Sequence, residues 1–185
     1  MIKLKKISEE DSGCLKQWWK WLDNNRGDRA QLRRASNADD VLLTPAFSHF
    51  LHAMPKNWRE GSTGKGASLS ISEIAVIAAV LARVKSEPSK AGVSFAKSLA
   101  LPKEAGGKAP MSELRFQQLQ KSRSPEVFFT LVCRAVNLLG GKANITSLAD
   151  DISHWLIEFR NGPASKPENR LAVRWASEYY AAFKD

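Results

Sequence analysis

Cysteine, histidine and long apolar runs are scarce in this 185-residue chain. The two cysteines, Cys14 and Cys133, are far apart and have neither metal-site spacing nor the density of a disulfide scaffold. We interpret both as free thiols and expect a reducing compartment. The longest apolar stretch, Ile74–Ala82, is too short to cross a bilayer. Residues Met1–Ile7 are not followed by the apolar segment of a signal peptide, so we expect a cytoplasmic protein.

The sequence offers no complete metal, cofactor or catalytic motif. His49 and His52 are spaced to share a helix face, but no third ligand lies near them. The Gly-Lys pairs at 64–65 and 107–108 lack the other residues of a phosphate-binding loop and follow no predicted strand. The acidic pairs at 39–40 and 150–151 lie near predicted helix starts, where they complement the helix dipole. No nucleophile has a local base. We therefore expect no metal, no cofactor and no enzyme activity.

Apolar residues recur with the 3.6-residue period of helices from end to end, and convincing strand-like alternation is absent. This pattern predicts an all-α fold. Trp18 and Trp19 belong to an apolar stripe and are interpreted as core anchors, whereas Trp21 lies off the stripe. The capping-box sequence at 70–73 starts a helix that is apolar nearly all round, which indicates a central buried position.

Three further helices are predicted in the C-terminal part. One starts at Ser124-Pro125 and ends at Gly140-Gly141, the next stops at 161–163, and the last opens at Pro167. Phe159 and Phe183 are assigned to inward-facing apolar stripes. Arg170, Arg174 and Glu178 are expected on the outer face of the last helix, where Arg174 and Glu178 are spaced to pair.

The glycine- and proline-containing stretch at 102–110 divides the chain into two groups of helices. We therefore predict two small helical bundles, an N-terminal one over residues 1–109 and a C-terminal one over residues 110–185. A second glycine-rich stretch at 56–68 is expected to be a mobile basic linker, and the sequence assigns it no role.

What the chain has in excess is positive charge, with a formal net charge of +9 and a pI of about 9.7. Such a charge favours binding to polyanions, although it also serves merely to keep a protein dispersed. Arg33 and Arg34 have no acidic residue at pairing distance on their helix, and guanidinium groups match phosphate oxygens. The candidate nucleic-acid contacts are Arg29, Arg33, Arg34, Arg115, Lys121, Arg123, Arg134, Arg170 and Arg174.

The order and spacing of several short motifs resemble the small subunit of the type I-E CRISPR Cascade complex, the CasB family. The motifs that carry this resemblance are Trp18-Trp19 with Leu22, Gly27–Arg34, Pro45–Phe47, Leu114–Leu119, Arg134–Leu139, Trp155, Arg174-Trp175 and Tyr179-Tyr180. Together they cover nearly the whole chain, and each alone is weakly specific.

The resemblance implies an all-helical, non-catalytic subunit of a crRNA-guided surveillance complex. It also implies the partners: the large subunit, the repeated backbone subunit, a second copy of the chain, the target DNA and the displaced strand. The small subunit would then stabilise the R-loop. Two alternatives stay open from the residues alone, a stand-alone helical nucleic-acid-binding protein and a helical adaptor whose basic face meets an acidic protein. Salt dependence of binding would separate the nucleic-acid functions from the adaptor.

Overall fold

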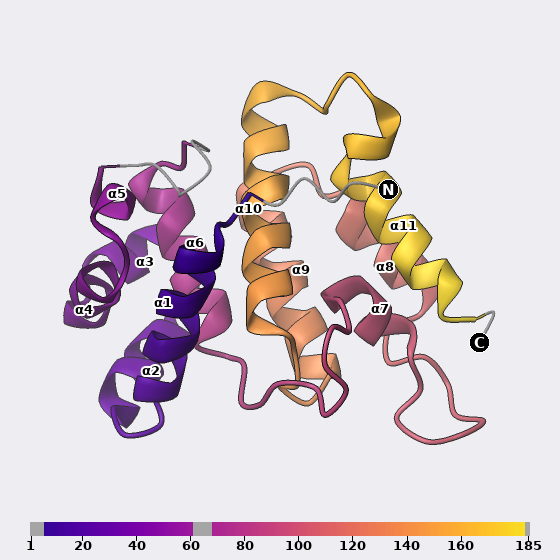
Figure 1. Ribbon diagram of the computed structural model, residues 1–185, viewed down its shortest axis with the longest axis horizontal. Helices are drawn as coiled ribbons and strands as arrows, with labels where there is room; N and C mark the ends of the chain where they lie inside the picture. Colours follow the sequence, from indigo (N-terminus) through magenta and orange to yellow (C-terminus); the bar gives the residue numbers. More distant parts are fainter. Residues whose placement is uncertain (1–5, 61–67, 184–185) are drawn as a thin grey trace.

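The structure, a computed structural model, describes residues 6–60 and 68–183, which form α-helices and one short 3₁₀ helix (Figure 1). These residues include no β-strand, and an isolated bridge pairs Ser86 with Lys142. The predicted all-α fold is therefore confirmed. The helices of the first half are α1 (Glu9–Trp21), α2 (Arg26–Arg34), α3 (Ala38–Leu42), α4 (Pro45–Ala53), α5 (Lys56–Arg59) and α6 (Ile71–Leu81).

The second half contributes two central helices and a layer beside them. In Figure 1, α9 and α10 run through the middle of the molecule, with α1–α6 on one side and α7, α8 and α11 on the other. The bounds of these elements are α7 (Phe95–Ala100), α8 (Glu113–Gln120), α9 (Pro125–Leu138), α10 (Ile145–Asn161), η1 (Pro167–Asn169) and α11 (Leu171–Ala181).

Helix α6 is the centre of the core. Every residue from Ile74 to Leu81 is buried, so this helix has no solvent-facing side over two turns. The predicted capping box starts it: the Ser70 hydroxyl accepts from the Glu73 backbone N–H at 3.2 Å, and the Ser70 backbone N–H donates to the Glu73 carboxylate at 2.6 Å. Helices α2, α3, α4, α9 and α10 all contact α6, which confirms its predicted central position.

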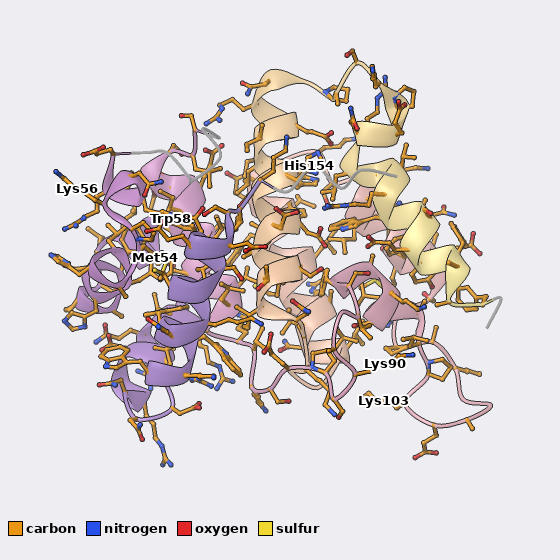
Figure 2. All side chains as sticks on the ribbon, in the orientation of Figure 1. Met54, Lys56, Trp58, Lys90, Lys103 and His154 are labelled. Carbon is orange, nitrogen blue, oxygen red and sulfur yellow. The ribbon has the colours of Figure 1, made fainter. Side chains whose placement is uncertain are left out.

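Tryptophans anchor the N-terminal helices. Trp18 and Trp19 are buried as predicted, and Trp19 Nε1 donates to the Val84 carbonyl at 2.9 Å. Trp58 is fully buried among these helices (Figure 2), and its Nε1 donates to Asp11 at 2.7 Å. Such an acceptor stabilises a buried indole N–H, because leaving the N–H unpaired costs desolvation energy. Trp21 is 42% exposed, in agreement with its position off the stripe.

The two predicted bundles share one continuous core in the structure. Helix α7, which falls within 1–109, packs against α11, and α1 packs against α10. The division into an N-terminal bundle over residues 1–109 and a C-terminal bundle over residues 110–185 stays a prediction. The linker predicted over residues 56–68 was wrong at its start, because Lys56–Arg59 form helix α5 and Trp58 is fully buried. Residues 61–67 of that stretch lie outside the described residues.

A close backbone approach joins α9 to the segment after α6. The carbonyl of Gly141 accepts from the Lys85 backbone N–H at 2.7 Å. Gly141 has a φ of +80°, and a Cβ there would meet Lys85 Cγ at 2.9 Å. Only glycine fits this position without strain, which explains the glycine pair at the end of α9.

A buried ionic cluster holds α10 against α11 and the chain start. Arg174 donates from Nη1 to Asp150 at 3.2 Å and from Nη2 to Asp151. Asp150 also accepts from the backbone N–H groups of Lys6 and Ile7. The expectation of an exposed Arg174 was therefore wrong, as was the placement of Asp150-Asp151 at a helix start. Helix α10 begins earlier, at Ile145, so both acids fall in its second turn and face inward.

Two phenylalanines also differ from their predicted inward positions. Phe159 is 50% exposed and Phe183 is 59% exposed. Each lies in the last turn of a helix or just after it, where the neighbouring helix no longer covers the stripe. Phe159 stacks on Trp155, and Phe183 packs edge-on against Tyr179.

The ionic cluster predicts a pH dependence of stability. Burial raises the pKa of Asp151 to about 7. The negative charges of Glu178 and Asp150 also raise this pKa, whereas the positive charge of Arg174 lowers it. In the unfolded chain the carboxyl titrates near 3.8. Between these two pKa values the folded state binds more protons at this carboxyl than the unfolded state does. The contribution of Asp151 to stability is therefore complete below the unfolded pKa and is lost as the pH rises toward 7.

We expect the free energy of unfolding to fall by roughly 1 kcal/mol per pH unit between pH 5 and pH 7 on account of this group. Asp151→Asn should remove that part of the slope, because the neutral amide keeps an acceptor for Arg174 and does not titrate. Urea unfolding of both proteins across this pH range measures the difference. Parallel profiles for the two proteins would contradict the prediction.

Candidate nucleic-acid interface

The nine candidate residues fall into different environments, and three of them are used inside the fold. Arg29 is half-buried and donates to Trp19 O at 3.2 Å and to Asp23 at 2.9 Å. Arg170 donates to Ala164 O at 2.7 Å and thereby holds the turn after α10. Arg174 is the centre of the buried ionic cluster. These guanidinium groups have intramolecular partners, so we leave them out of the proposed interface.

Arg33 and Arg34 are exposed in the last turn of α2, and neither side chain bonds to a described residue. Arg83, which was not among the predicted site residues, stabilises this turn by hydrogen bonds to its backbone. Arg83 donates to the carbonyls of Arg33 at 2.8 Å and Ala35 at 3.0 Å, and it lies 5.3 Å from the Phe129 ring centroid. Burial lowers the pKa of Arg83. Its only sequence signal is its place just after the apolar helix α6.

The other four candidates gather along helices α8 and α9. Arg115 of α8 and Arg134 of α9 line opposite sides of a hollow of about 450 Å³. Lys121 and Arg123, in the turn between the helices, line a second hollow of about 540 Å³. The two hollows share Gln118 and Leu131, so they are adjacent. We call them together the basic groove.

The basic groove has a uniform electrostatic character. None of the described residues that line it is acidic, and all four cationic side chains are exposed without a hydrogen bond or ion pair to a described residue. Its floor is apolar, formed by side chains such as Leu119, Leu131 and Leu138. The cations therefore have free donors that can bind phosphate oxygens, and the amides of Gln118 and Asn137 can donate to the same backbone.

The two basic surfaces are separate. In Figure 1, α2 and α8 lie on opposite sides of α10. Arg33 and Arg34 are therefore not part of the basic groove, and a nucleic acid would have to pass around the molecule, or involve two strands, to contact both surfaces. The sequence alone could not show this separation.

The histidines and cysteines have ordinary structural environments. His49 Nδ1 lies 2.7 Å from the Asp28 carboxylate, and His52 Nδ1 lies 2.7 Å from the Ser48 carbonyl. Within residues 6–60 and 68–183, no three metal-binding side chains of the His, Cys, Asp and Glu types come together. Burial raises the pKa of Cys133 to about 11, so its thiol is a poor nucleophile at neutral pH. Over the same residues, no helix is long and apolar enough to span a membrane.

Comparison with known proteins identifies the family. A search of curated proteins returned no match. The crystal structure of CasB from Thermus thermophilus has a similar fold, with a TM-score of 0.53 and 20% sequence identity over 90% of this chain and 97% of that one. The family model described as CRISPR-associated protein Cse2 matches residues 28–180. The resemblance to the CasB small subunit is thus confirmed, and the chain belongs to the Cse2 family of Cascade subunits.

Proposed function

We propose that the chain is a non-catalytic subunit of a cytoplasmic, crRNA-guided surveillance complex, where it stabilises the R-loop through contacts to the DNA backbone. The observation that carries this proposal is the basic groove, in which Arg115 of α8 and Arg134 of α9 line the same hollow and no lining residue is acidic. The partners would be the large subunit, the repeated backbone subunit and a second copy of the chain. Family membership supports the setting in such a complex.

The chemistry of the groove fits a backbone ligand. Guanidinium and ammonium groups bind phosphate without regard to base identity. In a guided complex the RNA reads the sequence by base pairing, so protein subunits need only backbone contacts. Arg33 and Arg34 would supply a second backbone contact on α2.

A charge reversal tests the groove directly. Arg115→Glu with Arg134→Glu should weaken binding of the full-length chain to unrelated single-stranded sequences by a similar factor, because both residues are proposed to contact phosphates. The slope of log affinity against log salt should become shallower by about 1.4, since each phosphate on a single strand contributes about 0.7. Fluorescence anisotropy at several salt concentrations measures both quantities.

The matched control is Lys90→Glu with Lys103→Glu. These exposed side chains lie on the loops on either side of α7 (Figure 2), and their reversal changes the net charge by the same amount. The control should keep most of the affinity and a nearly unchanged slope. Equal weakening by both pairs would show that net charge, not the groove, is responsible. Far-UV circular dichroism should show unchanged helicity in both.

A second experiment tests the role in the complex. A complex rebuilt without the chain should retain its guide RNA but open target duplex less completely, because the near-balanced strand exchange loses backbone contacts. Permanganate reactivity of the displaced strand measures the opening. Adding wild-type chain should restore it, and adding Arg33→Glu with Arg115→Glu should restore it only in part. Equal reactivity with and without the chain would leave no role in the R-loop and would favour the adaptor function.

A further inference from the structure

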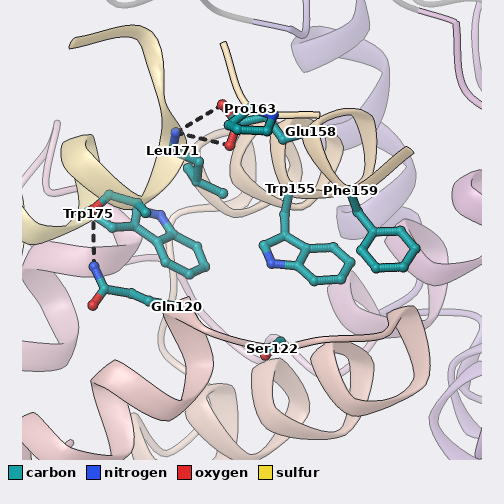
Figure 3. A pocket seen from close by; sticks show the side chains of 9 residues that line it. Gln120, Ser122, Trp155, Glu158, Phe159, Pro163, Leu171 and Trp175 are labelled. Atoms are coloured by element: carbon teal, nitrogen blue, oxygen red, sulfur yellow. Dashed lines mark hydrogen bonds between the residues drawn. The ribbon is translucent and has the colours of Figure 1, made fainter. Parts of the chain in front are cut away.

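A small cavity lined by aromatic rings lies at the turn between α8 and α9 that contains Ser122 (Figure 3). Its volume is about 280 Å³, and Trp155, Phe159 and Trp175 line it. We call it the aromatic slot. Ser122 lines both the slot and the basic groove, so the two are adjacent. The volume lies just below the range of about 300–1,000 Å³ for drug-sized ligands, which suits a single planar group.

The rings at the slot form an incomplete stack. Phe128 stacks on Trp155 with centroids 4.0 Å apart and planes 3° apart, and Trp155 continues to Phe159 at 5.2 Å and 8°. Phe128 is buried, whereas Phe159, the last ring, is 50% exposed. A flat aromatic ligand against Phe159 would extend the stack and remove apolar surface from water.

Polar atoms at the edge of the slot match the edge of a nucleobase. The Trp155 indole nitrogen points toward the space between Gln120 and Ser122 (Figure 3), and an indole N–H is a hydrogen-bond donor. Gln120 uses Nε2 to donate to Ala172 O at 3.0 Å, which leaves its Oε1 as an acceptor. The Ser122 hydroxyl donates to Leu119 O at 2.7 Å and keeps its lone pairs. The slot therefore offers one donor and several acceptors.

Charge determines which part of a nucleotide can enter. Burial disfavours the ionised form of Glu158, but hydrogen bonds from His154 and the Leu171 backbone outweigh burial and hold the pKa of this carboxyl below its usual value. An ionised Glu158 in the slot repels phosphate. Lys121 and Arg123, on either side of Ser122 in the chain, attract phosphate at the neighbouring groove.

We propose that the aromatic slot receives one unpaired base of a single strand, stacked on Phe159, while the phosphates of that strand follow Lys121 and Arg123. The inference rests on the proposed function and specifies its ligand: a single strand with accessible bases, because a base inside a duplex is unavailable for such stacking. It gives the groove a way to prefer the displaced strand over double-stranded DNA.

Abasic DNA separates the base contact from the phosphate contacts. Full-length chain at low ionic strength is titrated with a labelled single-stranded oligonucleotide and with the same length carrying abasic sites, which has the same phosphates. Wild type should bind the base-containing strand at least about fivefold more tightly, since one base–aromatic stack changes affinity by that factor or more. Phe159→Ala should bring the ratio close to one. Phe183→Ala, which truncates a similarly exposed phenylalanine outside the slot, should leave the ratio unchanged.

Crosslinking locates the base. A single strand containing 5-iodouracil, irradiated with the wild-type chain, should give adducts in the peptide that contains Trp155 and Phe159. Tight binding to both strands with a ratio near one, or adducts only elsewhere, would overturn the slot and leave the groove intact. Absence of single-strand binding by wild type would overturn both. Weaker binding of Arg115→Glu with Arg134→Glu at an unchanged ratio would confirm that groove and slot act separately.

Discussion

The need to bury α6 on all sides organises this fold. A helix that is apolar around its whole circumference cannot lie on a surface, and each buried Val, Leu or Ile contributes about 1.5–3 kcal/mol. Helices α2, α3 and α4 cover one part of it, and α9 and α10, from the other half of the chain, cover the rest. Neither half alone provides a complete cover. The core therefore crosses the loop at 102–110, and it fixes the orientation of α9, which forms one wall of the basic groove.

Arginine has two separate uses in this molecule. Arg174 and Arg83 satisfy buried carboxylates or backbone carbonyls and connect elements far apart in sequence, whereas Arg170 holds the local turn after α10. A charge buried in this way is costly to disturb, because removing one partner leaves the others unpaired. Arg115 and Arg134 stay in water and contribute little to folding. Substitutions in the groove thus alter binding with small effects on stability, whereas substitutions in the cluster alter stability first.

Local features were predictable from the sequence, and long-range pairings were not. The capping box at Ser70, the proline start of α9 and the glycine stop of α10 depend on neighbours within a few residues, and the structure agrees with each. Arg174 looked like a surface residue because its acidic partners are 23 and 24 positions away, on another helix. The groove was only half predictable: Arg115 and Arg134 were candidates, but their placement on facing helices depends on how α8 packs on α9. The slot could not be predicted because the exposure of Phe159 depends on how helices distant in sequence pack around the end of α10.

The arrangement of groove and slot makes weak, general binding the natural outcome. Exposed cations gain little from each phosphate at physiological salt, and one stacked base adds a contact that any sequence can provide. Strong or base-specific contacts would instead favour some targets and oppose the guide RNA as the reader of sequence. Because the RNA–DNA heteroduplex is about as stable as the DNA duplex that it replaces, a small favourable binding energy is enough to shift the exchange toward the open R-loop. Several modest contacts on a rigid helical frame supply this binding energy, and because α6 and the ionic cluster hold the frame, the strand does not have to order the protein when it binds.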